Sequence, residues 1–193
     1  MMQTVVFTEA FFFLCLIMSY IYLAYSSGFE PHDLSKLDIG TSGIYTALLI
    51  ISSFTLHLAE RGYNRGNTRA LKTWLIITLI LGSIFLIGQG REYAHLIQEK
   101  ITLESSVFGA SFFTLTGFHG LHVFIGLIIL AIMLALAFLG DFNRPAPAGS
   151  ESPDKPAPCG GALGAIAIYW HFVDIVWIIV FTVVYVLPQF TNI

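Results

Sequence analysis

Hydrophobic residues gather in five long stretches along the chain, and polar residues fill the intervals between them. A helix needs about 20 residues to cross a hydrocarbon core of roughly 30 Å, and each stretch approaches or exceeds that length. Strands of a membrane barrel would be about half as long and would alternate in polarity. We therefore predict an all-α integral membrane bundle of five transmembrane helices, at residues 4–25, 40–59, 73–90, 107–139 and 162–187.

The composition agrees with this prediction. Hydrophobic residues make up 56% of the 193 residues and charged residues 11%, whereas soluble domains carry about 25% charged residues. The first apolar stretch has no basic region before it and leads straight into a second stretch, so we expect a retained span rather than a cleaved signal peptide. Five of the seven prolines lie between residues 144 and 158. We therefore expect a single transmembrane domain over residues 1–193, with a flexible cytoplasmic loop at 141–160.

Basic residues predict the orientation of the bundle. Four of the nine lie close to the second interval, whereas the first interval carries Lys36 among three acidic residues. The excess of Lys and Arg in short loops marks the cytoplasmic side, so we predict the N-terminus inside and the C-terminus outside. The basic cluster could instead be a partner or nucleic-acid patch, but a net charge of -3 offers no basic footprint for nucleic acid. The four residues are Arg61, Arg65, Arg69 and Lys72.

Several ionisable residues lie inside or at the ends of the predicted spans. Such groups cost about 2.5 to 3.5 kcal/mol each on insertion scales, so each needs a partner or a function. Glu9 has aromatic and aliphatic neighbours on both sides, which favours its neutral, hydrogen-bond-donating form. It could be a proton-exchanging carboxyl group or an acid satisfied by a neighbouring helix. The candidates for proton-linked or structural roles are Glu9, His57, Glu92, His119, His122, His171 and Asp174.

The histidines raise the alternative of a metal site. His119 and His122 share a helical face, and the pairs His57 with Glu60 and His171 with Asp174 have the same spacing. Di-iron bundles, however, place Glu before His and need about four carboxylates, and two cysteines provide no thiolate framework. We therefore expect no catalytic, cofactor-binding or metal-binding residue here, and instead a network of hydrogen bonds between helices.

Two further segments carry polar groups, one within the fifth span and one at the end of the third. His171 and Asp174 share a face and are expected to form a local imidazole–carboxylate pair, next to Trp170 and Trp177 as packing and polar anchors. The segment Gly88–Tyr93 places Arg91 beside Glu92 at the end of the third span. A solvated helix end at the outer membrane interface is the simplest interpretation of that segment.

Four segments together closely resemble subunit III of cytochrome c oxidase. Ser111–Val123 is similar to the fourth-span signature of that family, Tyr169–Trp177 to its last helix, Gly88–Tyr93 to its Gln and Glu-Tyr helix end, and Glu9 before a Phe-rich run to its buried carboxylate. Their order and spacing also match, and the resemblance covers essentially the whole chain. The chain resembles the short, five-helix bacterial form of the family.

This resemblance implies an accessory role in a larger enzyme. A subunit III carries no haem or copper itself and packs against subunit I, and subunit II and a larger respiratory assembly are further candidate partners. It is expected to stabilise the catalytic subunit, support proton uptake and hold phospholipid along an oxygen route in a bacterial cell (inner) membrane. The complex reduces oxygen to water with electrons from cytochrome c and translocates protons.

Two departures from the family and four rival functions remain. The chain is expected to lack the two first helices of the long form, so family lipid sites there do not transfer, and Gly164 stands where many relatives have an acidic residue. Quinol oxidases and an accessory protein of nitric oxide reductase share the fold. A transporter would be expected to show internal repeats or broken helices, and neither is evident. A membrane metalloenzyme would need the histidines as ligands.

Overall fold

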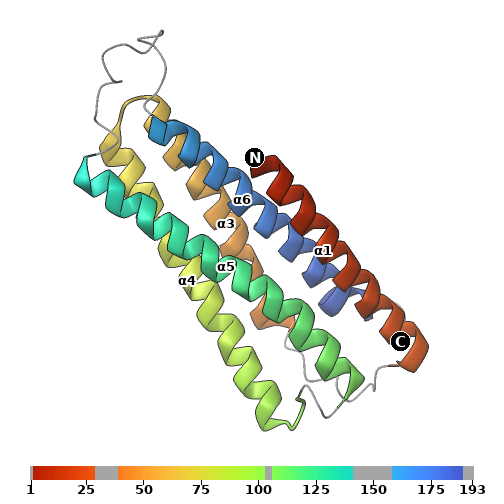
Figure 1. Ribbon diagram of the computed structural model, residues 1–193. Coiled ribbons are helices and arrows are strands. Elements are labelled where there is room, and N and C mark those ends of the chain that lie inside the picture. The colour runs from red at the N-terminus through yellow and green to blue at the C-terminus, as the bar shows by residue number, and fades with distance from the viewer. Residues whose placement is uncertain (1, 29–38, 103–105, 141–157, 189–193) are drawn as a thin grey trace.

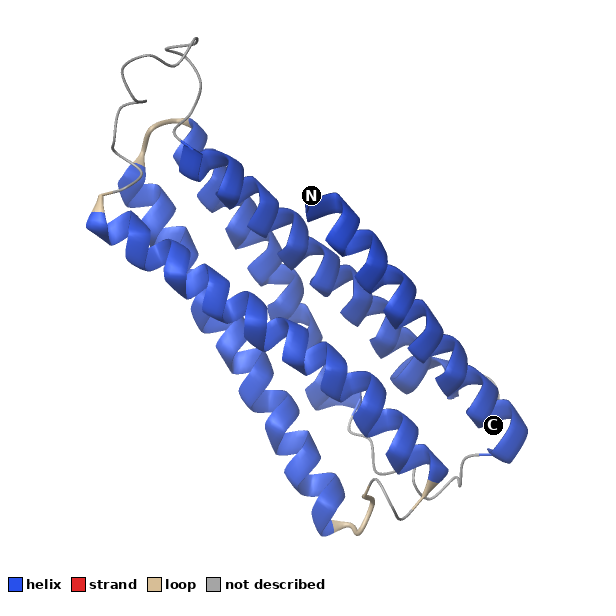
Figure 2. Cartoon of the chain, viewed as in Figure 1, coloured by secondary structure: helices blue, strands red, loops and turns tan. Residues whose placement is uncertain are grey.

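The computed structural model describes residues 2–28, 39–102, 106–140 and 158–188. Within these segments the chain is helical apart from short turns and ends, and none of them contains a strand (Figure 2). Five of the helices are long and apolar enough to cross a membrane, which confirms the predicted class and number of spans. They are α1 (Met2–Leu23), α3 (Ile39–Asn64), α4 (Thr68–Gln98), α5 (Val107–Leu139) and α6 (Pro158–Phe181), with π-helical turns η1 (Ala24–Gly28) and η3 (Thr182–Val186) after α1 and α6.

Four of the helices form a closed ring. Each of α3, α4 and α5 packs against the next helix along the chain, and α6 closes the ring against α3. The helix α1 lies outside this ring, against α5 and α6 (Figure 1). The helices α1, α4 and α6 run in one direction and α3 and α5 in the other. We call the end where α3 leads into α4 the Arg61 end, and the end where α3 begins the Glu92 end. Which of them faces the cytoplasm stays a prediction.

Helices α3 and α4 continue beyond the apolar stretches that predicted them. The turn between them is short, because Gly66 adopts a left-handed φ of 69° and the side chain of Asn67 accepts a hydrogen bond from the Ala70 amide at 3.1 Å. Arg61 and Arg69 therefore lie on helices rather than in a loop. Long basic side chains can reach water from a helix end. The apolar stretch therefore shows which part of a helix lies in lipid, but not where the helix ends.

The predicted proline-rich loop is shorter at its end than expected. Residues 141–157 of it lie outside the described residues, but Pro158 begins α6. Proline suits the first helical turn because the amide hydrogen it lacks has no partner there anyway. At the other side of the loop, Gly140 ends α5 with a left-handed φ of 82°.

The core of the ring is built around the two tryptophans of α6. Trp170 fits against two glycines, since a Cβ atom on Gly82 or Gly126 would lie 2.9 Å from its ring. Its indole nitrogen donates to the Ser52 hydroxyl at 3.1 Å, and the indole of Trp177 donates to the hydroxyl of Thr46 at 3.0 Å. The prediction that these tryptophans are packing and polar anchors is confirmed.

Candidate functional site

Glu9 and His122 meet where α1 packs on α5. The Nε2 atom of His122 lies 3.1 Å from the Oε2 atom of Glu9, and the Nδ1 atom of the same ring lies 2.7 Å from the carbonyl oxygen of Phe118. The ring of Phe13 contacts the imidazole edge-on, with 5.0 Å between centroids. Tyr169 of α6 donates its hydroxyl to the His122 carbonyl at 3.2 Å. Three helices therefore hold the pair in place.

This geometry determines how protons are distributed in the pair. A carbonyl oxygen only accepts hydrogen bonds, so Nδ1 of His122 carries a hydrogen and donates it to Phe118. A hydrogen bond between Nε2 and Glu9 then requires one proton between the two atoms. That proton belongs either to a neutral carboxyl group that donates to a neutral imidazole, or to an imidazolium that donates to a carboxylate. Both forms have the same total charge, so the proton can move within the pair without changing the charge in the membrane.

His119 has a different environment from His122, although both lie on α5. Its side chain is 1% exposed, stacks on Trp177 with 4.7 Å between ring centroids, and contacts Phe85 edge-on at 6.1 Å. Among the residues that the structure describes, neither ring nitrogen has a hydrogen-bond partner. His119 thus packs among aromatic rings in the core, whereas His122 binds the carboxyl group of α1.

The expected pair of His171 and Asp174 is not formed. His171 shares a hydrogen bond with the Ser53 hydroxyl through Nδ1, which draws its ring toward α3. The Asp174 side chain is buried, and within the described part of the chain neither of its oxygens has a hydrogen-bond partner of normal geometry, although Ser53 lies near it. A contact between an imidazole and a carboxylate three residues apart is formed elsewhere, by His57 and Glu60, whose Nδ1 and Oε2 atoms lie 3.8 Å apart. His171 and Asp174 do share a helical face, but the hydrogen-bond partner of His171 is Ser53 on α3.

Glu92 is not at a solvated helix end, because α4 continues to Gln98. Its carboxyl group accepts hydrogen bonds from Ser42 of α3 at 3.0 Å and from Tyr185 of η3 at 2.8 Å. Gln89, one turn earlier on α4, is a third donor at 3.5 Å. Glu92 therefore joins three segments of the chain, a role that the sequence interpretation missed.

The seven candidate residues occupy several separate places rather than one site. Glu9 and His122 lie together, His119 is in the aromatic core, His171 and Asp174 face α3, His57 is beside Glu60, and Glu92 is near the other end of α3. Within the described segments, no three His, Cys, Asp or Glu side chains come together in a way that could hold a metal ion. The metal site considered in the sequence analysis, built from histidine and carboxylate pairs of three helices, is therefore not formed by these residues.

The hydroxyl groups of α3 are the polar residues that the sequence interpretation did not single out. Ser42, Thr46, Ser52 and Thr55 are all buried, and Thr55 shares a 2.8 Å hydrogen bond with Thr78 of α4. Ser42 and Thr46 are four residues apart and Ser52 and Thr55 three apart, so each of these two pairs shares a helical face. The small polar residues within a predicted span were the available signal.

A family model described as cytochrome c oxidase subunit III matches residues 1–189 of the chain. The chain belongs to the cytochrome c oxidase subunit III family. It is 37% identical over 178 residues to the probable cytochrome c oxidase subunit 3 of Mycobacterium leprae, an alignment that covers 92% of this chain and 82% of that protein. It is 35% identical over 181 residues to cytochrome c oxidase subunit 3 of Synechocystis sp., with 93% and 71% covered.

Membership in the subunit III family agrees with the fold. Five helices able to span a membrane make this a multi-pass membrane protein, and its relatives are subunits of cytochrome c oxidase, a respiratory enzyme complex. Gly164, where the resemblance led us to expect a departure from many relatives, faces α3, and a Cβ atom there would lie 3.9 Å from a Glu60 oxygen.

Proposed function

We propose that the chain is the non-catalytic subunit III of a proton-translocating haem-copper cytochrome c oxidase in a bacterial inner membrane. In this proposal the subunit stabilises the catalytic subunit and supports its proton uptake. The family match over residues 1–189 supports the assignment to the oxidase. The hydrogen-bonded pair of Glu9 and His122 is the observation that supports the proton-linked role.

The argument from the pair is chemical. One proton lies between Nε2 of His122 and the Glu9 carboxyl group, and it can be transferred without a change in total charge. Both side chains are only partly buried, at 13% and 33% side-chain exposure, so a second proton donor or acceptor can approach from outside the bundle. A group with these properties can take up a proton and pass it on, which is the basis of general acid–base behaviour.

Partner subunits carry the redox centres in this proposal. Haem and copper belong to subunit I and subunit II, and this chain contributes no ligand to them. Subunit I is the direct partner, and membrane phospholipid and oxygen approach it along the surface of this subunit. The outward side chains of α1 offer an apolar surface for such contacts, with Phe7, Phe11 and Leu14 all exposed.

Cytochrome c is the electron donor that we favour. The relatives from Mycobacterium leprae and Synechocystis sp. are both named for cytochrome c, and this supports the choice. A quinol oxidase and the accessory protein of nitric oxide reductase are the alternatives with the same fold.

Purification through a tag on this chain tests the assignment. The tagged protein is extracted in a mild detergent, and its reduced-minus-oxidised optical spectrum and its oxygen uptake with cytochrome c and with quinol are measured. We expect haem spectra in the co-purified complex, uptake driven by cytochrome c, and no metal on the chain once its partners are stripped away. Metal retained by the separated chain would contradict the proposal. Oxygen uptake driven only by quinol would show that quinol, and not cytochrome c, is the electron donor.

A further inference from the structure

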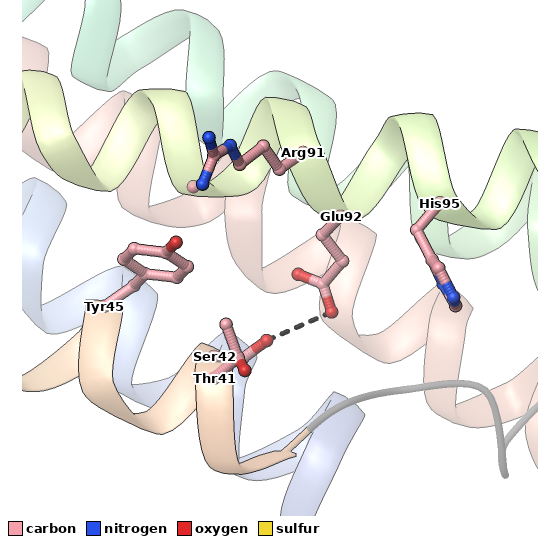
Figure 3. Close-up of a pocket in the computed structure, with 7 residues that line it drawn as sticks. Thr41, Ser42, Tyr45, Arg91, Glu92 and His95 are labelled. Carbon is pink, nitrogen blue, oxygen red and sulfur yellow. Dashed lines mark hydrogen bonds between the residues drawn. The ribbon is translucent and has the colours of Figure 1, made fainter.

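A polar pocket lies between α3 and α4 near the Glu92 end of the bundle. Its volume is about 250 Å³. Tyr45 lines it from α3, and Arg91, Glu92 and His95 line it from α4 (Figure 3). Arg91 and His95 are one helical turn apart on α4, and both are exposed. The pocket therefore opens at the outer surface of the bundle, where a group from another molecule can enter it.

The carboxyl group of the pocket is already engaged within the chain. Glu92 accepts hydrogen bonds from Ser42 at 3.0 Å and from Tyr185 at 2.8 Å, and it points toward Ser42 (Figure 3). The side chain of Arg91 extends along α4 toward Tyr45 instead (Figure 3). Among the residues that the structure describes, Arg91 forms no ion pair. Its positive charge is therefore not compensated by the neighbouring carboxyl group.

The groups of the pocket that are not engaged are hydrogen-bond donors. The guanidinium group of Arg91 carries several N–H donors and no acceptor, the hydroxyl group of Tyr45 can donate, and the imidazole of His95 has an N–H group in either charge state. Within the described segments, none of these three side chains forms a hydrogen bond. A carboxylate matches a guanidinium group with a pair of parallel hydrogen bonds. The pocket is thus suited to a carboxylate from outside the chain.

A row of exposed isoleucines leads along α4 to this pocket. Ile76, Ile80 and Ile84 follow one another at intervals of four residues, and Ile87 continues the row to within one turn of Arg91. Even the least exposed member, Ile76, is 38% exposed. Residues four apart form the ridges that fit into the grooves of another helix, and β-branched side chains have little χ1 freedom to lose when they pack. An acyl chain adapts to any apolar surface, so this isoleucine row favours a helix as its occupant.

No other helix of the described chain covers the isoleucine row. In the ring, α4 packs against α3 and α5, whereas α1 packs against α5 and α6, so that α1 and α4 lie at opposite edges of the bundle (Figure 1). The row ends at a basic residue, whereas α1 (Met2–Leu23) contains no lysine or arginine. The outer face of α4 therefore combines an apolar length with a positive charge at one end, which the exposed face of α1 does not.

We propose that the outer face of α4 docks a transmembrane helix of another subunit of the oxidase, with an aspartate or glutamate of that helix bound to Arg91. The isoleucine row packs against apolar side chains of the partner helix, and the partner's carboxylate enters the pocket, where Tyr45 and His95 are further donors. This inference rests on the proposed function, because it names a surface through which the chain contacts a partner in the oxidase.

A partner carboxylate accounts for the charge of Arg91 at such an interface. A helix packed over the isoleucine row excludes water from the neighbouring guanidinium group, and a desolvated charge without a counter-charge is strongly destabilising. A partner with an uncharged residue at that point would leave Arg91 unpaired, and one with a lysine or arginine there would be repelled. The face therefore selects its partner by charge at one point and by packing along its length.

Chemical cross-linking of the purified complex tests for the carboxylate. The variant Arg91→Lys keeps the positive charge and introduces a primary amine, which a carbodiimide joins to a touching carboxylate as an amide while the carbodiimide takes up the water as a urea. The complex is extracted through a tag on this chain, treated with a water-soluble carbodiimide and digested for peptide mass spectrometry. We expect an amide between the introduced amine and an aspartate or glutamate of another polypeptide, and no such product at this position with the original chain.

Charge reversal tests whether that contact holds the subunits together. Arg91→Glu places a negative charge against the partner's carboxylate, so the ratio of partner polypeptides to the tagged chain should fall about tenfold or more, as loss of one charge-assisted contact implies. Lys100→Glu makes the same change of charge at an exposed residue of the same end and should leave the ratio unchanged. Replacing the cross-linked carboxylate by lysine in the presence of Arg91→Glu should restore the complex, which it would not do if the variant merely failed to fold.

The outcomes separate this inference from the proposed function. A chain that purifies without partners contradicts both. A complex that keeps its partners contradicts the inference alone if the introduced amine joins only to carboxylates of its own chain or to none, as it would if lipid or water covered the face. The inference is also overturned if Lys100→Glu lowers the partner ratio as much as Arg91→Glu does, or if the exchange of charges does not restore the complex.

Discussion

The two ring nitrogens of His122 bind groups on two different helices, the Glu9 carboxyl group on α1 at 3.1 Å and the Phe118 carbonyl on its own helix at 2.7 Å. Since α1 lies outside the four-helix ring, this contact is a polar bond that attaches it to α5.

Removal of the imidazole should therefore loosen α1. In the variant His122→Leu, Glu9 loses its partner in the membrane, and we expect the free energy of unfolding to fall by about 1 to 3 kcal/mol. In Glu9→Gln the amide can still donate to Nε2, so stability should remain close to that of the original chain. Thermal unfolding in detergent measures both. Equal losses in the two variants would contradict this account of the contact.

The close packing of Trp170 gives a second prediction. A methyl group on Gly126 would lie 2.9 Å from the indole ring, whereas one on Gly120, on the same helix, would meet nothing closer than 4.0 Å. We expect Gly126→Ala to cost about 1 to 3 kcal/mol of stability, as overpacking does. Gly120→Ala should be neutral or slightly stabilising, because Ala is the better helix former.

Unfolding midpoints of these two alanine variants, measured side by side in the same detergent, check this prediction. If Gly126→Ala unfolds at the same temperature as Gly120→Ala, the tryptophan is not held as tightly as the structure indicates.

The hydrogen bond from Tyr185 to Glu92 ties the end of the chain to α4. Tyr185→Phe removes that 2.8 Å bond from a buried position, and we expect a loss of about 1 to 2 kcal/mol in stability. Tyr25→Phe makes the same chemical change at an exposed residue of η1 and serves as the control. Chemical denaturation of both variants measures the difference, and a control as unstable as Tyr185→Phe would count against a specific role for the bond.

The orientation of the bundle is a prediction from the basic residues alone. Alkaline phosphatase fused after the last residue should be active, because the enzyme folds outside the cytoplasm, whereas the same enzyme inserted at Gly66 should be inactive. The opposite pattern of activity would show that the Arg61 end faces outward.

The sequence was sufficient for the fold class because lipid imposes a simple rule, that a span must be long, apolar and helical. It was insufficient for helix ends, since Arg61 and Arg69 continue their helices beyond the apolar region. Hydrogen-bond partners were harder still to predict. Helical spacing shows that His171 and Asp174 share a face, but the choice of Ser53 by His171 depends on how α3 packs against α6.

In the candidate site, too, the sequence indicated the residues but not their partners. Glu9 was singled out alone and His122 together with His119, yet the sequence contains no signal that joins two positions on α1 and α5. Glu92 was placed at a solvated end because it follows Arg91, and only the packing of α3 and η3 around it reveals that Ser42 and Tyr185 donate to it.

Proton-linked turnover of the purified complex tests the central proposal most directly. Oxygen uptake driven by cytochrome c and proton release are followed over many turnovers with the original chain, with Glu9→Gln, and with Glu60→Gln, which makes the same change at another carboxyl group beside a histidine. The account predicts that Glu9→Gln loses proton uptake or inactivates several-fold faster, while Glu60→Gln behaves like the original chain. Unchanged turnover and proton release in Glu9→Gln would contradict it.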